Sequence, residues 1–171
     1  MLVGIFADSH DHLDHLRAAV ETFNQAGCEQ ILFAGDLVST FAIPVLRKLR
    51  APFLGVFGDN EGNKPGLLAG VTIVGQLGEA PLGYRSPDGV RFLLAHMQRQ
   101  LRGHEDGADV LVYAHTHRPS FGYDQAGRLH INPGETSGWT FGRPTVVLFD
   151  TDTRRPELIE LAQQPSQSLP K

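Results

Sequence analysis

Short apolar runs alternate with a segment of helical periodicity over the first third of the chain. The runs lie at residues 2–7, 31–34 and 53–57, and their lack of polar side chains is typical of strands buried on both faces. Between the first two, apolar side chains recur three or four residues apart at Leu13, Leu16, Val20 and Phe23. This spacing predicts a helix capped by Asp11 at its start and by Gly27 at its end. A shorter helix is expected at 41–49, so the order βαβαβ favours parallel strands.

The rest of the chain has shorter runs that are separated by turn residues. Strands are expected at residues 71–75, 82–85, 90–95, 110–114, 121–123, 129–131 and 145–149. The turn sequence at 86–89 predicts antiparallel hairpins that lead into the strand at 90–95. A short helix or loop is expected at 98–106 and a frayed tail at 165–171. The chain is therefore expected to form a single α/β domain over residues 1–164.

Metal-ligand side chains follow five of these apolar runs. They are Asp8 and His10, then Asp36, then Asp59 or Asn60, then His96, and finally His115 and His117. Ligands of open α/β sheets bind at the carboxyl ends of the strands, so these side chains are expected to meet at one rim. Seven or eight such groups exceed the needs of one tetrahedral zinc ion and suit a pair of divalent ions.

A pair of ions bound in this way points to phosphate-ester hydrolysis. Nitrogen and oxygen ligands suit manganese, with iron, zinc, nickel or cobalt as alternatives. Two such ions can activate a water for in-line attack on phosphorus, so no serine or cysteine nucleophile is required. Asp36 is the candidate for a carboxylate that bridges the ions, because its strand lies between those of the other ligands in the sequence. The expected substrate is a small phosphate ester.

Composition and net charge limit the partners, the kind of metal site and the cellular location that fit this chain. The 171-residue chain has a net charge of −4 and no basic run, so nucleic acid is not favoured as a partner. Cys28 is the only cysteine, which excludes an internal disulfide and a thiolate metal cluster. The first apolar run is too short for a membrane span, so a cytoplasmic location is expected. A homo-oligomer is compatible with the sequence.

These residues, taken in order, resemble the calcineurin-like metallophosphoesterases. The matching motifs are Asp8-x-His10, Gly35-Asp36, Gly58-Asp59-Asn60-Glu61, His96 and Ala114-His115-Thr116-His117. The short chain and the turn at 132–134 resemble the small YfcE-like phosphodiesterase branch. The resemblance implies a four-layer αββα sandwich of two mixed sheets.

The resemblance also implies roles for the matching residues. Asp8, His10 and His117 would bind the first metal, Asp36 would bridge, and His96 and His115 would bind the second metal. The family usually places asparagine where Asp59 stands, so either Asp59 or Asn60 supplies the third-loop ligand. Many relatives carry a histidine as leaving-group acid where Asn60 stands. Because an amide cannot give up a proton, good leaving groups are expected to be preferred.

Two alternatives remain for the function. A scaffold that binds proteins can share this fold, as in the retromer scaffold subunit, which resembles the same branch. A phosphomonoesterase would use the same ligands. Every ligand position holds a competent residue type, which favours an enzyme, with Asp36, Asn60 and His96 as its catalytic residues.

Several further residues have two possible roles. His12 and His15 lie off the apolar face of the predicted helix and are expected to be solvated. His104 can replace the missing acid or be solvated. The aromatic side chains Phe121, Trp139 and Phe141 can line a pocket, with core or oligomer contacts favoured. The guanidinium groups of Arg99, Arg102 and Arg118 can meet substrate phosphate, with surface positions favoured.

Overall fold

A computed structural model describes residues 1–161 as two β-sheets with helices on one side. The helices are α1 (Leu13–Ala26), α2 (Ile43–Leu46) and α3 (Lys64–Val71), with short 3₁₀ helices η1 (Thr40–Ala42) and η2 (Gln98–Leu101). The strands are β1 (Leu2–Phe6), β2 (Gln30–Phe33), β3 (Phe53–Val56), β4 (Gly75–Gly78), β5 (Leu82–Arg85), β6 (Arg91–Leu94), β7 (Val110–Val112), β8 (Ser120–Tyr123), β9 (Leu129–Asn132), β10 (Thr145–Asp150) and β11 (Arg155–Glu160).

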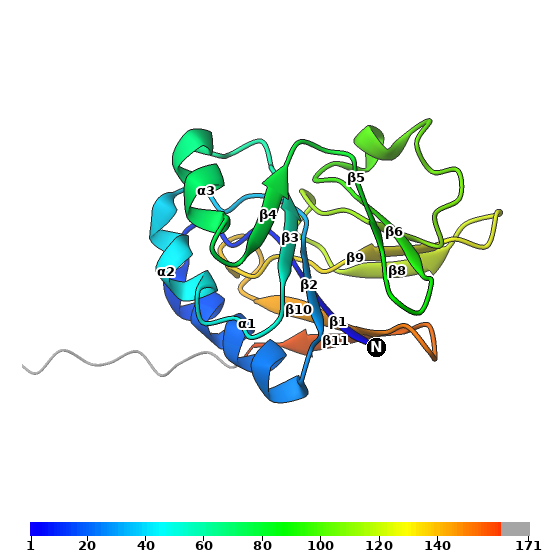
Figure 1. Ribbon diagram of the computed structural model, residues 1–171, viewed down its shortest axis with the longest axis horizontal. Helices are drawn as coiled ribbons and strands as arrows, with labels where there is room; N and C mark the ends of the chain where they lie inside the picture. Colours follow the sequence, from blue (N-terminus) through cyan, green and yellow to red (C-terminus); the bar gives the residue numbers. More distant parts are fainter. Residues whose placement is uncertain (162–171) are drawn as a thin grey trace, which may run out of the picture.

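Both sheets are mixed, as predicted. The first has the order β11-β10-β1-β2-β3-β4, in which β1 to β4 are parallel and β10 and β11 are antiparallel additions. The second has the order β5-β6-β7-β9-β8, with parallel pairing only among β6, β7 and β9. Figure 1 shows the three helices on the outer face of the first sheet and the second sheet on its other side. The arrangement agrees with a metallophosphoesterase sandwich. The outer face of the second sheet carries only η2 among the described helices.

The central strands are apolar throughout because both of their faces are buried. Phe6 and Phe33 pack against the helices, whereas Ile5 and Leu32 face the second sheet. Between the sheets lies a core to which β6, β7 and β9 contribute aliphatic and aromatic side chains. Gly4 allows α1 to approach β1, since a Cβ atom there would lie 2.6 Å from Cδ1 of Phe23. The carboxyl ends of β1, β2 and β3 are thus held by two cores.

The prediction of a strand at residues 71–75 is wrong. The segment before it forms α3, whose first turn contains Pro65 and whose Asn63 side chain accepts a hydrogen bond from the Gly66 N–H. The strand β4 begins only at Gly75 and pairs in parallel with β3, not in a hairpin with β5. The apolar run at 71–74 belongs to the end of the helix and the turn after it, because periodicity does not separate short helices from short strands.

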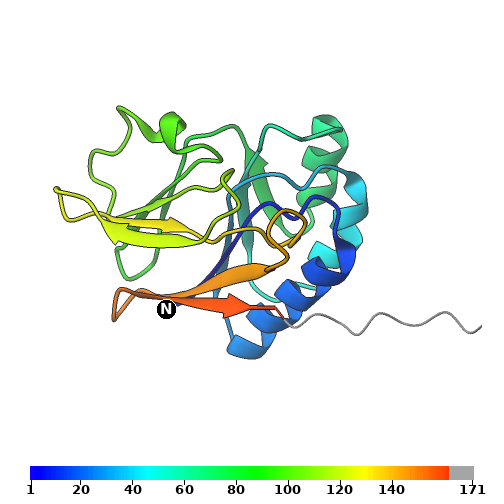
Figure 2. The ribbon, with the colours of Figure 1, turned by 180° about the vertical axis from the view of Figure 1, so that it is seen from behind.

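Two other details differ from the prediction. The strand predicted at 145–149 is not the last one, because β11 follows and pairs with β10 along the sheet edge, as Figure 2 shows. Its charged residues on the exposed face hid the strand pattern. The helix α1 is capped by His12 rather than Asp11, whose carboxylate instead accepts hydrogen bonds from Ser39. The short helices expected at 41–49 and 98–106 are confirmed as η1 with α2 in the first segment and as η2 in the second.

The domain limit at residue 164 and the tail at 165–171 lie outside the described residues, so both stay predictions. No helix within residues 1–161 has the length and apolar character needed to cross a membrane.

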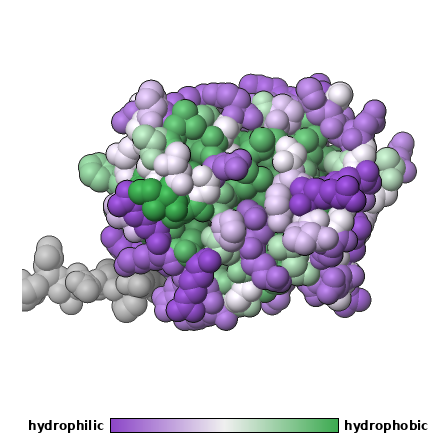
Figure 3. All heavy atoms as spheres, viewed as in Figure 1, coloured by the Kyte–Doolittle hydropathy of each residue, from purple (hydrophilic) through white to green (hydrophobic). Residues whose placement is uncertain are grey.

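Hydrophobic side chains gather over α3 and β4 on the face drawn in Figure 3. Leu68 of α3 is 44% exposed and Ile73 before β4 is 64% exposed. A homo-oligomer stays a prediction.

Candidate metal centre

The carboxyl ends of five strands meet at one rim of the two sheets. Strands β1, β2 and β3 of the first sheet, and β6 and β7 of the second, are followed by the predicted ligands. Within each sheet these strands run parallel, so their ends lie on the same side. Side chains more than a hundred residues apart are therefore brought together, as His10 and His117 demonstrate.

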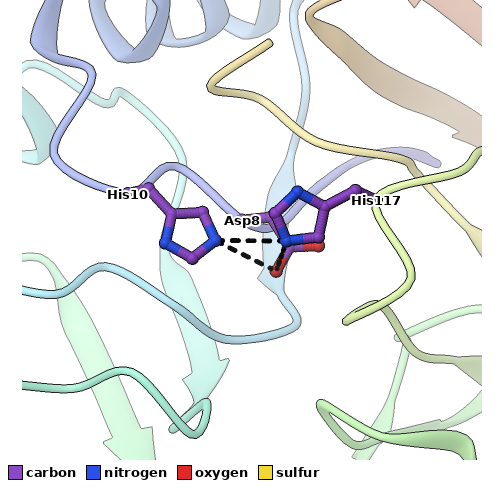
Figure 4. Close-up of side chains that lie close together, drawn as sticks. All are labelled: Asp8, His10 and His117. Atoms are coloured by element: carbon purple, nitrogen blue, oxygen red, sulfur yellow. Dashed lines mark hydrogen bonds and ion pairs between the residues drawn. The ribbon is translucent and has the colours of Figure 1, made fainter. Parts of the chain in front are cut away.

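The first group of ligand atoms comes from Asp8, His10 and His117. The Nε2 atoms of the two histidines lie 3.3 Å apart, and Oδ1 of Asp8 lies 3.8 Å from that of His10 and 3.7 Å from that of His117. Figure 4 shows both rings and the carboxylate pointing toward one another, with Asp8 and His10 on the loop after β1 and His117 on a separate segment. The three atoms surround one point, which is the arrangement of ligands around an ion.

A second group lies beside the first. Oδ1 of Asp59 is 2.7 Å from Nε2 of His96 and 3.2 Å from Nδ1 of His115. Asp36 stands between the groups, because its Oδ2 lies 3.5 Å from Nε2 of His10 and 3.4 Å from Nε2 of His96. The structure thus places one buried carboxylate in contact with a histidine of each group.

The carboxylate of Asp8 shows that these residues fit cations. It is fully buried, and neither oxygen has a hydrogen-bond partner among the described residues. Burial, with added repulsion from Asp36, raises the pKa of Asp8 from 3.8 to about 8. A buried carboxylate without donors is costly unless a positive charge compensates it. A divalent ion at this position supplies that charge.

Buried hydrogen bonds orient two of the imidazoles. His96 donates its Nδ1–H to the carbonyl of Ala34 at 2.8 Å, and His117 donates its Nδ1–H to Oε2 of Glu135 at 2.9 Å. These bonds leave both Nε2 atoms as acceptors that face the groups, which is how proteins fix metal-binding histidines. Although burial alone would raise it, hydrogen bonds from the Thr140 N–H and His117 keep the pKa of Glu135 below its ordinary value. Glu135 is not among the residues predicted from sequence, where only its position after the turn at 132–134 signals it.

Most of the grouped residues have a backbone that is unusual for residues other than glycine. The φ angles are positive at Asp8 (51°), His10 (41°), Asp36 (68°), His115 (67°) and His117 (61°). Such conformations persist only where the surrounding structure enforces them, and they collect at functional sites. Local strain at five candidate ligands indicates that their positions are set by the fold.

Glu61 holds the loop that carries Asp36. Its carboxylate accepts hydrogen bonds from the N–H groups of Asp36, Val38 and Gly58 at 3.0, 2.7 and 3.1 Å. Val38 also has a positive φ of 78°, which is strained for a β-branched residue. Glu61 therefore fixes the turns after β2 and β3 against each other. It stands in the third-loop motif, but the sequence assigned it no role.

Asn60 does not join either group. Its backbone N–H and its Nδ2 donate to Oδ1 and Oδ2 of Asp36, each at 2.9 Å. The structure brings Asp59 rather than Asn60 to His96 and His115. Asn60 thus holds both oxygens of Asp36 in place.

The other histidines differ in position. His104 lines a surface hollow with Arg91 and Asp106, near the start of β6 and away from the end that carries His96. His12 and His15 lie outside both ligand groups, as expected, but they are half-buried rather than fully solvated. Their rings stack at 3.7 Å because the loop after β9 folds back over the start of α1, where the Ser137 carbonyl lies 2.6 Å from Nδ1 of His15.

Gly58 leaves the room that Asp36 occupies, and Gly58→Ala tests this. A Cβ atom at Gly58 would lie 1.9 Å from Oδ1 of Asp36, so the variant must displace the carboxylate. We expect affinity for Mn²⁺ to fall about 10- to 100-fold, the usual cost of disturbing the support of metal ligands. Calorimetric titration with Mn²⁺ measures it. Gly122→Ala, where nothing lies within 4 Å, is the matched control. Unchanged affinity in Gly58→Ala would show that Asp36 is free to move.

Comparison with known proteins identifies the family of this chain. The model of the calcineurin-like phosphoesterase superfamily domain matches residues 1–154. A phosphodiesterase of Methanocaldococcus jannaschii is 31% identical over 160 residues, which span 90% of this chain and 95% of that protein. A solved archaeal phosphodiesterase superposes with a TM-score of 0.86 at 30% identity, over 94% of this chain and 100% of that one.

A second solved structure shares the fold at lower identity. The E. coli phosphoesterase YfcE superposes with a TM-score of 0.69 at 19% identity, covering 95% of this chain and 100% of its own. The family model spans every strand of the two sheets except β11, and every residue of the two ligand groups. The chain belongs to the calcineurin-like phosphoesterase superfamily.

Proposed function

We propose that this chain is a phosphodiesterase with two divalent ions. Asp8, His10 and His117 would hold one ion, and Asp59, His96 and His115 would hold the other. Asp36 would bridge them, because its Oδ2 contacts a histidine of each group. The single observation that carries the proposal is this shared carboxylate between two sets of converging ligand atoms.

The family makes the chain a hydrolase of phosphate esters. Two observations support diesters as the substrate class. The relative that is 31% identical and the solved structure that is 30% identical are both phosphodiesterases, and each is matched over at least nine-tenths of its length. A match over nearly the full length of both proteins supports the same substrate class for this chain.

The chemistry divides between the ions and the protein. When bound, a pair of divalent ions polarises the phosphoryl oxygens and lowers the pKa of a bound water to yield the nucleophile. The protein holds the imidazole rings in fixed orientations through Ala34 and Glu135. Asn60 and Glu61 fix Asp36 from the side chain and the backbone respectively.

Asn60 determines which esters react well. It stands where many relatives carry an acidic imidazole, and both of its donors are directed to Asp36. Since an amide supplies no proton to the departing oxygen, esters of acidic alcohols such as nitrophenol should react fastest. General acid catalysis contributes about 10²- to 10⁴-fold, which is the expected gap between aryl and alkyl diesters.

Manganese is the proposed metal, and the cytoplasm is the proposed location. The mixed nitrogen and carboxylate ligands suit manganese, iron, zinc, nickel or cobalt. The one cysteine, Cys28, is a buried thiol, which agrees with a reducing compartment.

Hydrolysis of chromogenic esters tests the proposal. We expect bis(p-nitrophenyl) phosphate to be cleaved with Mn²⁺ and not with chelator, and faster than p-nitrophenyl phosphate at equal concentration. Metal analysis of the active protein should give two ions per chain. A faster reaction with the monoester would indicate a phosphomonoesterase. Absence of chelator-sensitive hydrolysis with all five metals would favour a protein-binding scaffold and overturn the proposal.

A further inference from the structure

The loop after β9 presents two exposed aromatic rings beside the first ligand group. Trp139 is 66% exposed and Phe141 is 46% exposed. Large apolar side chains are normally buried, so rings that stay exposed in a defined position are informative. The same loop begins with Glu135, the carboxylate that orients His117.

Hydrogen bonds to Glu135 fix this loop. Its Oε1 accepts from the Phe141 N–H, and its Oε2 accepts from the Thr140 N–H at 2.9 Å and from the Ser137 hydroxyl at 3.3 Å. Glu135 is fully buried, so these bonds are shielded from water. One carboxylate thus sets the position of both a candidate metal ligand and the two aromatic residues.

The ring of Trp139 is held at the edge of the metal centre. Its Nε1–H donates to the carbonyl oxygen of His10 at 3.3 Å, and the ring lies 4.5 Å from the ring of His12. His12 in turn stacks on His15, which contacts the carbonyl of Ser137 in the same loop. Trp139 is therefore supported by His12 while most of its surface faces solvent.

A cation stands next to Phe141. The guanidinium of Arg118 lies 4.6 Å from the centre of the Phe141 ring, and Arg118 directly follows His117. Within residues 1–161, no carboxylate forms an ion pair with Arg118. The fold therefore keeps an unneutralised cation beside the centre, where a phosphate oxygen is its natural partner.

We propose that Trp139 stacks on a planar aromatic group of the phosphodiester substrate, and that Arg118 binds one of its phosphate oxygens. A nucleoside ester is the chemical class that carries both features. The inference rests on the proposed function, because it assigns a substrate class to the same centre. Stacking suits an exposed, fixed indole, since every nucleobase has a π face and pairs of aromatic rings attract at short distance. The net charge of −4 favours a small nucleotide ester over a nucleic-acid polymer.

Fluorescence provides a direct test, because Trp139 is the only tryptophan of the chain. Adenosine 5′-monophosphate and ribose 5-phosphate share a phosphate and a sugar and differ in the base. With Mn²⁺ present, we expect the adenosine compound to change the emission of Trp139 in a saturable way and to bind at least about 5-fold more tightly than ribose 5-phosphate. Equal affinity of the two ligands, or no binding of either, would overturn the inference.

Substitutions at Trp139 distinguish stacking on the ligand from an indirect role in which Trp139 positions His10. Trp139→Ala should weaken binding of adenosine 5′-monophosphate at least about 5-fold in calorimetry and leave ribose 5-phosphate unchanged. Trp139→Phe, which keeps a ring but loses the N–H, should retain most of the affinity. Tyr123→Ala is the matched control, since Tyr123 is also 66% exposed but lies at the far end of β8. Equal weakening of both ligands in Trp139→Ala would make Trp139 a positioning residue for His10 and overturn the inference.

Two outcomes distinguish failure of this inference from failure of the proposed function. Loss of base preference with intact Mn²⁺-dependent hydrolysis of bis(p-nitrophenyl) phosphate would reject only the aromatic site. Saturable binding of the adenosine compound without any hydrolysis would reject the phosphodiesterase and keep the aromatic site.

Discussion

Asp36→Asn is expected to reduce kcat for bis(p-nitrophenyl) phosphate by about 10²- to 10⁴-fold. The carboxylate contacts a histidine of each ligand group, so its loss weakens both candidate ion sites at once. Asp59 contacts only the second group and is 43% exposed at its side chain. Asp59→Asn should therefore cost less activity and release mainly one ion.

Activity assays together with metal analysis measure this difference. At equal free Mn²⁺, wild type should carry two ions per chain and Asp59→Asn should carry about one firmly bound ion. Asp36→Asn should carry fewer ions than either of them. Asp14→Asn is the control, because Asp14 is an exposed partner of Arg17 on α1. Equal losses of activity and metal in the two variants would contradict a bridging role for Asp36.

Asp8→Asn should raise the stability of the metal-free protein at pH 8 and reduce its stabilisation by Mn²⁺. The pKa of Asp8 is about 8 in the folded state and 3.8 for an ordinary carboxyl. Between these values the folded state holds a proton that the unfolded state has released, so stability falls as pH rises. The penalty is on the order of 5 kcal/mol at pH 8. A buried amide without partners costs about 1–3 kcal/mol, so the variant still gains.

Urea unfolding in chelator at pH 5 and pH 8 measures the effect. At pH 8 the free energy of unfolding of Asp8→Asn should exceed that of wild type, whereas at pH 5, where the penalty is only about 2 kcal/mol, the two should be similar. Mn²⁺ should then raise the stability of wild type more than that of Asp8→Asn, because the variant loses a ligand of the first group and keeps the ligands of the second. A metal-free variant that is less stable than wild type at pH 8 would show that the Asp8 carboxylate is not under electrostatic strain.

The central strands could be predicted from sequence because their pattern depends on burial alone. The runs that contain Ile5, Leu32 and Val56 are apolar since both sheet faces are covered, and this is visible in any short window. The segment at 71–78 could not be assigned in this way. There the helix end at Val71 and the strand start at Gly75 follow from the packing of α3 and the pairing of β4 with β3.

The candidate ligands could likewise be predicted as a set but not as an arrangement. Polar residues at strand ends are local features, so Asp8, Asp36 and His96 were found without coordinates. The choice between Asp59 and Asn60 was open, because a one-residue shift in a loop leaves no trace in composition. In the structure Asp59 contacts His96 and Asn60 contacts Asp36, and both partners lie far away in the chain.

Local sequence is enough to indicate which residue types stand at the ends of the buried strands, and therefore that a rim of carboxylates and imidazoles forms. The groups that support this rim follow only from the three-dimensional fold, among them Glu61, Glu135 and the contact of Trp139 with His10. Side-chain type and periodicity are properties of neighbouring residues. Hydrogen bonds between loops depend on where the whole fold brings each backbone, and no local pattern records that.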